Sequence, residues 1–230
     1  MLRLSGIHAG YGRVGVLRGV DLVVPAGSVV ALLGANGAGK TTLLKVAAGL
    51  LAPTQGTVAL GGTTIERLTP SRRVGRGLCL IPEGRGIFRR LTVRQNIAMF
   101  VGGRDVETAV ERAAEMFPKL GSRLTQTAGT MSGGEQQMLA VVRALVTDPA
   151  VVLADELSIG LAPVVCDEIF NAVAALRAEG RSLLVVEQYV DRVLGLSDYV
   201  YVLHKGEVAF VGVPAQCGPD LFERYLGGAA

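Results

Sequence analysis

Short apolar runs alternate with turn residues over the first third of the chain. Between residues 2 and 32 the runs are broken by turn-forming stretches such as AGYGR and VPAGS, a pattern that predicts antiparallel strands. Residues 28–34, SVVALLG, form a continuous apolar run that predicts a buried strand, and a glycine-rich turn and the helix KTTLLKVAAGLL follow it directly. Two further strands are predicted at 56–62 and 77–82.

The pattern becomes helical between about residues 86 and 148. The segment DVETAVERAAEMF begins with Asp105, a candidate N-cap, and GEQQMLAVVRALV predicts another helix. The first of these helices places five apolar residues on one face: Val106, Ala109, Val110, Ala113 and Phe117.

Three β-branched runs follow, at 150–155, 182–187 and 198–212, and the last predicts two strands joined by a Lys-Gly turn. We find no internal repeat and no low-complexity linker. The chain is therefore expected to form a single domain over 1–230: an α/β core with an N-terminal antiparallel β region and an inserted helical subdomain at about 86–148.

Composition agrees with a compact α/β protein. Half of the 230 residues are hydrophobic, 31 are glycine and 19% are charged. The net charge of +3, from 23 basic and 20 acidic residues, is smaller than a dedicated nucleic-acid-binding domain would show, so no nucleic-acid partner is expected. The densest basic runs, RRVGR and RGIFRR, are interpreted as solvated surface.

Cysteine, histidine and apolar-run patterns exclude several kinds of site. Cys79, Cys166 and Cys217 are far apart and include no C-x-x-C pair, which argues against a disulfide framework or a zinc site. His8 and His204 have no matching ligands nearby and receive no role. No run approaches the roughly 18 apolar residues of a membrane span, and no signal segment is evident. We expect a cytosolic chain, or one held at a membrane through a partner.

Residues 34–42, GANGAGKTT, match the phosphate-loop pattern G-x-x-x-x-G-K-[ST] between a predicted strand and a predicted helix. Glycines at the pattern's turns let successive N–H groups face a phosphate, Lys40 reaches the β- and γ-phosphates, and the Thr41 hydroxyl can bind Mg²⁺. The alternative is a glycine-rich turn that happens to hold Lys-Thr. The predicted nucleotide-binding residues of this loop are Gly34, Ala35, Asn36, Gly37, Ala38, Gly39, Lys40, Thr41 and Thr42.

The apolar run VVLADE ends in two carboxylates, Asp155 and Glu156. Adjacent strand residues point to opposite faces, so one carboxylate suffices for the metal and the other is free to polarise water as a general base. We assign the metal to Asp155 and the base to Glu156. A solvated Asp-Glu pair at a strand end is the alternative.

A second candidate phosphate site lies at TMSGGEQQML. Ser132 and Glu135 form the S-x-x-E signature of a capped helix N-terminus, where an anion can bind. Gly133 and Gly134 would remove side chains from the path of an approaching phosphate. A plain capping box is the alternative, which the double glycine weakens.

Three features follow one another along the chain: the phosphate loop, the stretch S-G-G-x-Q-Q, and a strand ending in Asp-Glu. In this order they resemble the pattern of the ATP-binding-cassette (ABC) ATPases, and the resemblance covers nearly the whole chain. The resemblance implies that two cassettes face each other head to tail, and that Ser132, Gly133 and Gly134 contact ATP held by the opposite phosphate loop. It also implies that Tyr11 stacks on adenine. Residues 80–99 resemble the loop that senses the metal and the membrane partner, with Glu83 in place of the usual glutamine.

Four other positions follow or depart from the family pattern. In LSIGLAP, Ser158 and Gly160 match the loop by which two cassettes touch, while Leu157 replaces a proline. In VVEQY, Gln188 replaces a histidine that contacts the γ-phosphate; glutamine can donate a hydrogen bond but cannot become cationic. These departures concern catalytic strength more than the fold.

Taken together, Glu83, SIGLAP and VEQ are similar to the corresponding residues in one of the two ATPase subunits of branched-chain amino acid importers. Urea and short-amide importers share much of this pattern. The resemblance implies ATP and Mg²⁺, membrane-spanning permease subunits, a second ABC ATPase subunit, identical or different, and indirectly an extracytoplasmic solute-binding protein. It implies peripheral location on the cytoplasmic face of the cell membrane. The alternatives are an ABC ATPase acting on DNA or ribosomes, whose coiled-coil inserts or second cassette do not fit in 230 residues, and a small kinase or GTPase, for which no N-K-x-D motif is present.

Overall fold

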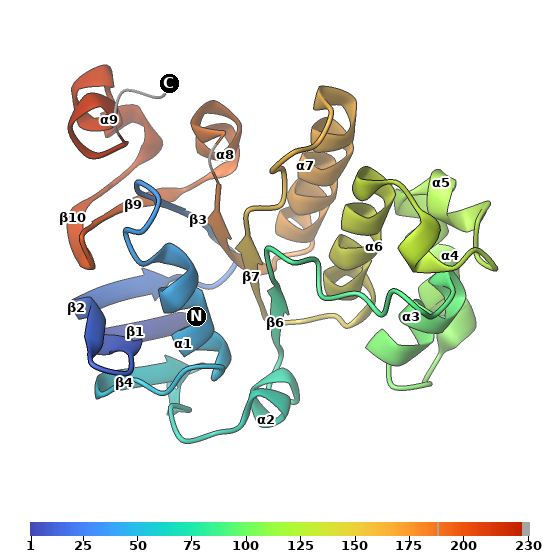
Figure 1. Cartoon of the computed structure of the whole chain (residues 1–230), viewed down its shortest axis with the longest axis horizontal. Helices are drawn as coiled ribbons and strands as arrows, with labels where there is room; N and C mark the ends of the chain where they lie inside the picture. The colour runs from blue at the N-terminus through green and yellow to red at the C-terminus, as the bar shows by residue number, and fades with distance from the viewer. Residues whose placement is uncertain (188, 227–230) are drawn as a thin grey trace.

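The computed structural model describes residues 1–187 and 189–226, whose strands form two sheets with helix α1 between them (Figure 1). The first sheet is antiparallel, and its strands in spatial order are β2 (Val14–Val24), β1 (Leu2–Tyr11), β4 (Gln55–Leu60) and β5 (Thr63–Thr64). The prediction of an N-terminal antiparallel region is confirmed, and the strand predicted at 56–62 belongs to this sheet.

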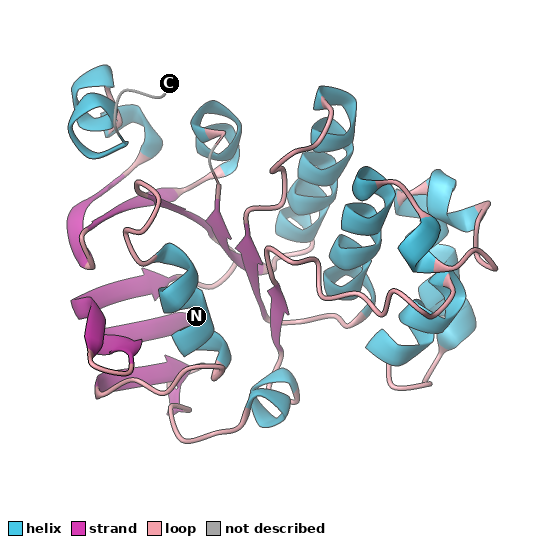
Figure 2. Cartoon of the chain, viewed as in Figure 1, coloured by secondary structure: helices cyan, strands magenta, loops and turns pink. Residues whose placement is uncertain are grey.

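The second sheet is mostly parallel and forms the centre of the molecule (Figure 2). Its strands in spatial order are β10 (Glu207–Gly212), β9 (Tyr199–His204), β3 (Val29–Leu33), β8 (Ser182–Val186), β7 (Val151–Asp155) and β6 (Leu78–Ile81). Only the β9–β10 pair is antiparallel. The antiparallel prediction for residues 2 to 32 was therefore wrong for β3, because a continuously apolar strand is buried on both faces of a parallel sheet.

The parallel sheet separates two hydrophobic cores because its side chains alternate between its faces. On β3, Val30 and Leu32 pack with α1 (Lys40–Ala48) and the antiparallel sheet. Val29 and Ala31 belong to the other core, which contains residues of α6 (Gly133–Val146) and α7 (Pro163–Ala178). Because β3, β8 and β7 are parallel neighbours, their carboxyl ends lie side by side. This is the edge at which parallel α/β sheets bind ligands.

The helices α3, α4, α5 and α6 follow β6 in the chain and precede β7, within the predicted helical segment. The bounds of the first three are Val93–Phe100, Val106–Met116 and Pro118–Gly121, and a 3₁₀ turn spans Ala128–Thr130. The predicted apolar face of α4 is confirmed, since Ala109, Val110, Ala113 and Phe117 are buried and Val106 is partly buried. Asp105 is the N-cap residue of α4, as predicted, but it has a φ of 43° and its side chain makes no capping hydrogen bond.

Several elements had no sequence prediction. They are α2 (Pro70–Val74), α7, α8 (Val190–Leu196), α9 (Pro219–Leu226), strand β5 and a 3₁₀ turn at Pro214–Gln216. Helix α7 lies beside α6 in Figure 1, and both cover one face of the parallel sheet. No helix within residues 1–187 and 189–226 has the length and apolar character needed to span a bilayer.

Candidate functional site

The loop between β3 and α1 is wrapped around the end of the parallel sheet. At Gly34 (φ 150°) a Cβ would lie 2.3 Å from the carbonyl oxygen of Leu203, and at Gly39 (φ 109°) it would lie 2.8 Å from a methyl carbon of Leu17. Glycine at these two positions therefore allows the backbone to turn tightly against β9 and β2 before α1 begins at Lys40. The first turn of α1, with its free N–H groups, opens toward this loop.

Lys40 is nearly buried at the start of α1. Its Nζ donates hydrogen bonds to the carbonyl oxygens of Gly34 (2.7 Å) and Ala35 (3.2 Å). Burial lowers the pKa of Lys40, and the nearby carboxylates of Glu156 and Asp155 partly oppose that shift. The ammonium group is thus held where the loop, the helix start and two carboxylates meet.

Thr41 and Asp155 come together although 114 residues separate them in the chain. The Thr41 hydroxyl donates to Oδ1 of Asp155 at 3.3 Å, and Asp155, the last residue of β7, is only 3% exposed. Burial raises the pKa of Asp155 to about 6; the Thr41 hydrogen bond opposes this, whereas Glu156 and Glu83 add to it. A hydroxyl beside a carboxylate is an oxygen donor set that fits Mg²⁺ bound together with nucleotide phosphates.

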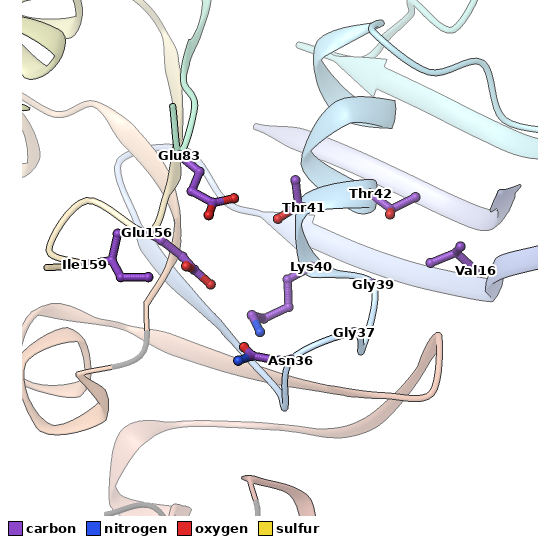
Figure 3. A pocket seen from close by; sticks show the side chains of 10 residues that line it. All are labelled: Val16, Asn36, Gly37, Gly39, Lys40, Thr41, Thr42, Glu83, Glu156 and Ile159. Atoms are coloured by element: carbon purple, nitrogen blue, oxygen red, sulfur yellow. The ribbon is translucent and has the colours of Figure 1, made fainter. Parts of the chain in front are cut away.

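Glu156 leaves the strand in a left-handed backbone conformation. Its φ is 50°, which is uncommon for a residue with a side chain, and its backbone N–H donates to the carbonyl oxygen of Val186 on β8 at 2.9 Å. This turn directs the Glu156 carboxylate into the space in front of Lys40, as Figure 3 shows. Asp155 and Glu156 therefore have different surroundings, the first bonded to Thr41 and the second facing the cavity.

These residues surround a cavity of about 470 Å³ (Figure 3). The cavity is lined by Val16, Asn36, Gly37, Gly39, Lys40, Thr41, Thr42, Glu83, Glu156 and Ile159. The structure thus brings together most of the predicted loop residues, Glu83 and Glu156. The predicted residue Gln188 lies outside the described residues.

Tyr11, predicted to stack on adenine, is not among the residues that line the cavity. It ends β1, is 47% exposed, and the centre of its ring lies 5.7 Å from Nζ of Lys45 on α1. Val16 and Ile159 do line the cavity, and the sequence interpretation missed both. Only the folding of β2 and of the β7–α7 loop over the phosphate loop places these two apolar side chains there.

The second candidate phosphate site lies on α6, away from this cavity. Ser132 and Glu135 form the predicted capping box: Ser132 Oγ accepts the N–H of Glu135, and the Glu135 carboxylate accepts the N–H of Ser132 at 2.9 Å. The N–H of Ser132 is the main cause of a lowered Glu135 pKa. Neither Ser132 nor Gly133 nor Gly134 lines the cavity around Lys40, so the chain presents two separate candidate anion sites.

The two glycines have neighbours within their own chain. A Cβ at Gly134 would lie 2.9 Å from a methyl carbon of Val165 on α7, and one at Gly133 would lie 3.1 Å from the Arg85 guanidinium. Packing of α6 on α7 is therefore sufficient to require glycine at 134, a reason that the sequence interpretation did not consider. Gly133 is exposed, and its nearest neighbour is a flexible arginine.

Removing the buried charge at Asp155 should stabilise the nucleotide-free chain. Because the folded pKa of about 6 lies above the ordinary value of 3.8, the folded state binds the proton more tightly, and the stability lost through ionisation grows as the pH rises from 3.8 to about 6 and is complete above that. In metal-free buffer at pH 7.5 we expect Asp155→Asn to raise the free energy of unfolding by about 1–2 kcal/mol. Chemical denaturation of both proteins at several pH values measures this. The difference should shrink as pH falls from 6 to 4, and a constant difference would contradict the buried-charge explanation.

Comparisons with known proteins agree on one family. A family model described as ABC transporter matches residues 17–158. The chain is 40% identical to the high-affinity branched-chain amino acid transport ATP-binding protein BraG of Pseudomonas aeruginosa, over 99% of this chain and 100% of that protein. It is 38% identical to the probable branched-chain amino acid transport ATP-binding protein LivF of Archaeoglobus fulgidus, over 92% of each chain.

A solved structure gives the same result for the fold. The cassette MJ1267, described as an ATP-binding cassette of an ABC transporter, superposes with a TM-score of 0.82 at 27% identity, covering 97% of both chains. The predicted α/β phosphate-loop ATPase fold is confirmed by this likeness and by the two sheets described above.

Proposed function

We propose that this chain, which belongs to the ABC transporter family and is an ATPase of that family, drives an importer of branched-chain amino acids. The observation that carries the proposal is the full-length likeness to BraG, together with a cavity that gathers Lys40, Thr41 and Glu156. Membership of the family supports the ATPase activity, whereas the identity of the cargo is our inference from the likeness to BraG and LivF.

The residues around the cavity have distinct proposed roles in ATP hydrolysis. The loop N–H groups and Lys40 bind the β- and γ-phosphates, since cationic and N–H donors stabilise charge on a transferring phosphoryl group. Thr41 and Asp155, with Glu83 nearby, hold Mg²⁺, which neutralises phosphate charge when bound. Glu156 accepts a proton from the attacking water, and Gln188 orients the γ-phosphate.

Two cassettes are proposed to close around ATP. Ser132, Gly133 and the N–H groups at the start of α6 would contact the γ-phosphate held by the opposite cassette, because they do not line their own chain's cavity. Tyr11 keeps its proposed contact with adenine, to which Val16 adds an apolar surface. The opposite cassette is either a second copy of this chain or a different ATPase subunit.

Membrane-spanning permease subunits would receive the motion of the two cassettes. We place their contact near residues 83–90, which join the cavity residue Glu83 to the helices α3 and α6. The chain would then lie on the cytoplasmic face of the membrane, held there by the permease, and an extracytoplasmic binding protein would deliver the cargo.

The proposed contact of Ser132 with the opposite cassette predicts a selective loss of activity. Ser132→Arg places a bulky side chain at the exposed start of α6, so hydrolysis should fall by about 100-fold or more while ATP affinity of the monomer stays within about twofold. The measurements are phosphate release and a nucleotide-binding titration. Thr92→Arg, which breaks the similar capping box of α3, controls for the loss of a helix cap. Weakened ATP binding in the Ser132→Arg monomer would mean that the segment serves its own nucleotide.

Transport measurements test the cargo. In the organism that encodes this chain, deletion of its gene should lower uptake of labelled leucine, isoleucine and valine, and the wild-type gene should restore it while a Lys40→Ala version should not. Urea and short amides serve as competing cargo in the same cells. Loss of urea or amide uptake with unchanged leucine uptake would overturn the branched-chain assignment but leave the ATPase assignment intact.

A further inference from the structure

A buried carboxylate holds the loop that follows Glu156. Ser158 is fully buried, and its backbone N–H donates to Oε1 of Glu187 at 3.2 Å while its hydroxyl donates to Oε2 at 2.5 Å. Glu187, the residue after β8, is itself only 3% exposed. Both oxygens of this carboxylate are thus directed to one residue of a neighbouring segment, 29 positions away in the chain.

The remaining polar group of Ser158 is also bonded within the chain. Its carbonyl oxygen accepts the N–H of Leu161 at 3.2 Å and lies 3.7 Å from the Cys166 sulfur. Leu157, next to Ser158, is 1% exposed, whereas Ile159 is 45% exposed and lines the cavity of Figure 3. Hydrogen bonds therefore hold Ser158 in place, and the residue that follows it, Ile159, lines the nucleotide-binding cavity.

The hydrogen bonds of Ser158 continue the pairing of β7 with β8 beyond the end of the two strands. The parallel register ends with Asp155 opposite Val186, and the N–H of Glu156 still donates to the carbonyl oxygen of Val186. Past that point the chain turns at Glu156, and the Glu187 side chain accepts the backbone N–H of Ser158. Glu156 is therefore held on both sides, by β8 before it and by Ser158 after it, and Ile159 directly follows Ser158.

Burying a carboxylate is costly unless hydrogen bonds compensate, so this arrangement needs a reason beyond filling space. A general base must be held within a fraction of an ångström of its productive position, and misplacement by 1 Å can lower a rate by about 100-fold. Glu156 has an uncommon backbone conformation that a free loop would not maintain. The anchored Ser158, two residues later, restricts the conformations open to Glu156.

We propose that Glu187 is a positioning residue for ATP hydrolysis: by binding the N–H and hydroxyl of Ser158 it fixes the loop that sets Glu156 and Ile159 at the cavity. Glu187 acts through Ser158 and does not touch the nucleotide. This inference rests on the proposed role of Glu156 as the general base.

Two substitutions at Glu187 distinguish the effect of its hydrogen bonds from the effect of its negative charge. Glu187→Ala removes both acceptors and should lower kcat for ATP by about tenfold or more while KM stays within about twofold, because binding uses the phosphate loop and not this one. Glu187→Gln keeps an amide oxygen for the Ser158 N–H and an NH₂ group that can donate to Ser158 Oγ, so it should retain most of the rate. Hydrogen exchange should quicken at the Ser158 amide in Glu187→Ala and stay unchanged at the Leu43 amide of α1.

Ser158→Ala provides a second route to the same result and keeps the test valid if Glu187→Ala does not fold. It removes the hydroxyl and leaves the N–H bond in place, so kcat should fall less than in Glu187→Ala. Since both side chains belong to one contact, the double variant should be no slower than Glu187→Ala alone.

Four outcomes would overturn the inference. They are an unchanged kcat in Glu187→Ala, a raised KM with unchanged kcat, a Glu187→Gln variant as slow as Glu187→Ala, and additive effects of the two sites. Failure of the proposed base would be seen separately, as normal turnover by Glu156→Gln, whatever the Glu187 variants do.

Discussion

Glu156→Gln should reduce the rate of ATP hydrolysis by about 1,000-fold while leaving ATP affinity within about threefold. General-base catalysis contributes roughly 10²–10⁴ to an enzymatic rate, and glutamine has nearly the same shape as glutamate but cannot accept the proton. The structure makes the substitution conservative, because the backbone N–H of Glu156, and not its side chain, bonds Val186. Phosphate release at saturating ATP measures the loss.

The same variant should accumulate as a dimer in the presence of Mg-ATP. If hydrolysis normally reopens two closed cassettes, a chain that binds ATP without cleaving it stays closed, and its solution mass should double only when ATP is present. Glu207→Gln, an exposed carboxylate on β10, is the matched control and should stay monomeric with normal turnover. A Glu156→Gln chain that hydrolyses ATP normally would remove Glu156 from the base role.

A persistent monomer of Glu156→Gln would have a different meaning from normal turnover. It would indicate that this chain closes only against a different cassette, or that the start of α6 does not contact a second nucleotide. Repeating the mass measurement with the companion ATPase subunit added distinguishes these cases. Dimerisation only with the companion would establish a heterodimer, and no association in either experiment would contradict the two-cassette arrangement.

Lys40→Ala should weaken ATP binding by about 100-fold or more. Each hydrogen bond to a charged group is worth about 1.5–3 kcal/mol, and Lys40 supplies a nearly buried ammonium among N–H donors that carry only partial charges. Its loss also leaves Asp155 and Glu156 without the cation that now offsets their repulsion of phosphate. A calorimetric titration with ATP measures the affinity.

The control for Lys40→Ala is a lysine of the helical segment. Lys119→Ala removes an exposed ammonium that pairs with Glu168 at 2.7 Å, far from the phosphate loop in the chain, and should leave ATP affinity unchanged. Thermal unfolding of both variants separates loss of binding from loss of fold. Unchanged ATP affinity in a folded Lys40→Ala chain would contradict the assignment of the whole cavity.

Local patterns were sufficient for the parts of the site that lie within one turn or one strand. The phosphate loop, the capping box of Ser132 with Glu135, and the strand ending at Asp155 all depend on residues within a few positions of each other, so their geometry follows from backbone conformation and short-range hydrogen bonds. Helix α7 was missed although Pro163 at its first position and its apolar spacing are helix signals. Asp105 holds the predicted N-cap position of α4, but its left-handed backbone goes with a side chain that makes no capping hydrogen bond.

Contacts between distant segments needed the tertiary structure. The Thr41–Asp155 hydrogen bond, the Ser158–Glu187 anchor and the contact of Gly134 with Val165 each join separate elements. Which residues meet depends on the strand order β3–β8–β7 and on the packing of α6 against α7, and neither leaves a periodic signal in the chain.

The α/β class, the phosphate loop and the two carboxylates could be inferred from the amino-acid order alone, because each depends on residue types at short, regular spacing; the family resemblance adds the order of these motifs along the chain. The folded chain was needed to show that Asp155 is the buried carboxylate bonded to Thr41, that Glu156 turns into the cavity, and that Val16 and Ile159 complete its wall. Burial, and with it the pKa of Asp155, depends on side chains that separate strands and loops bring together.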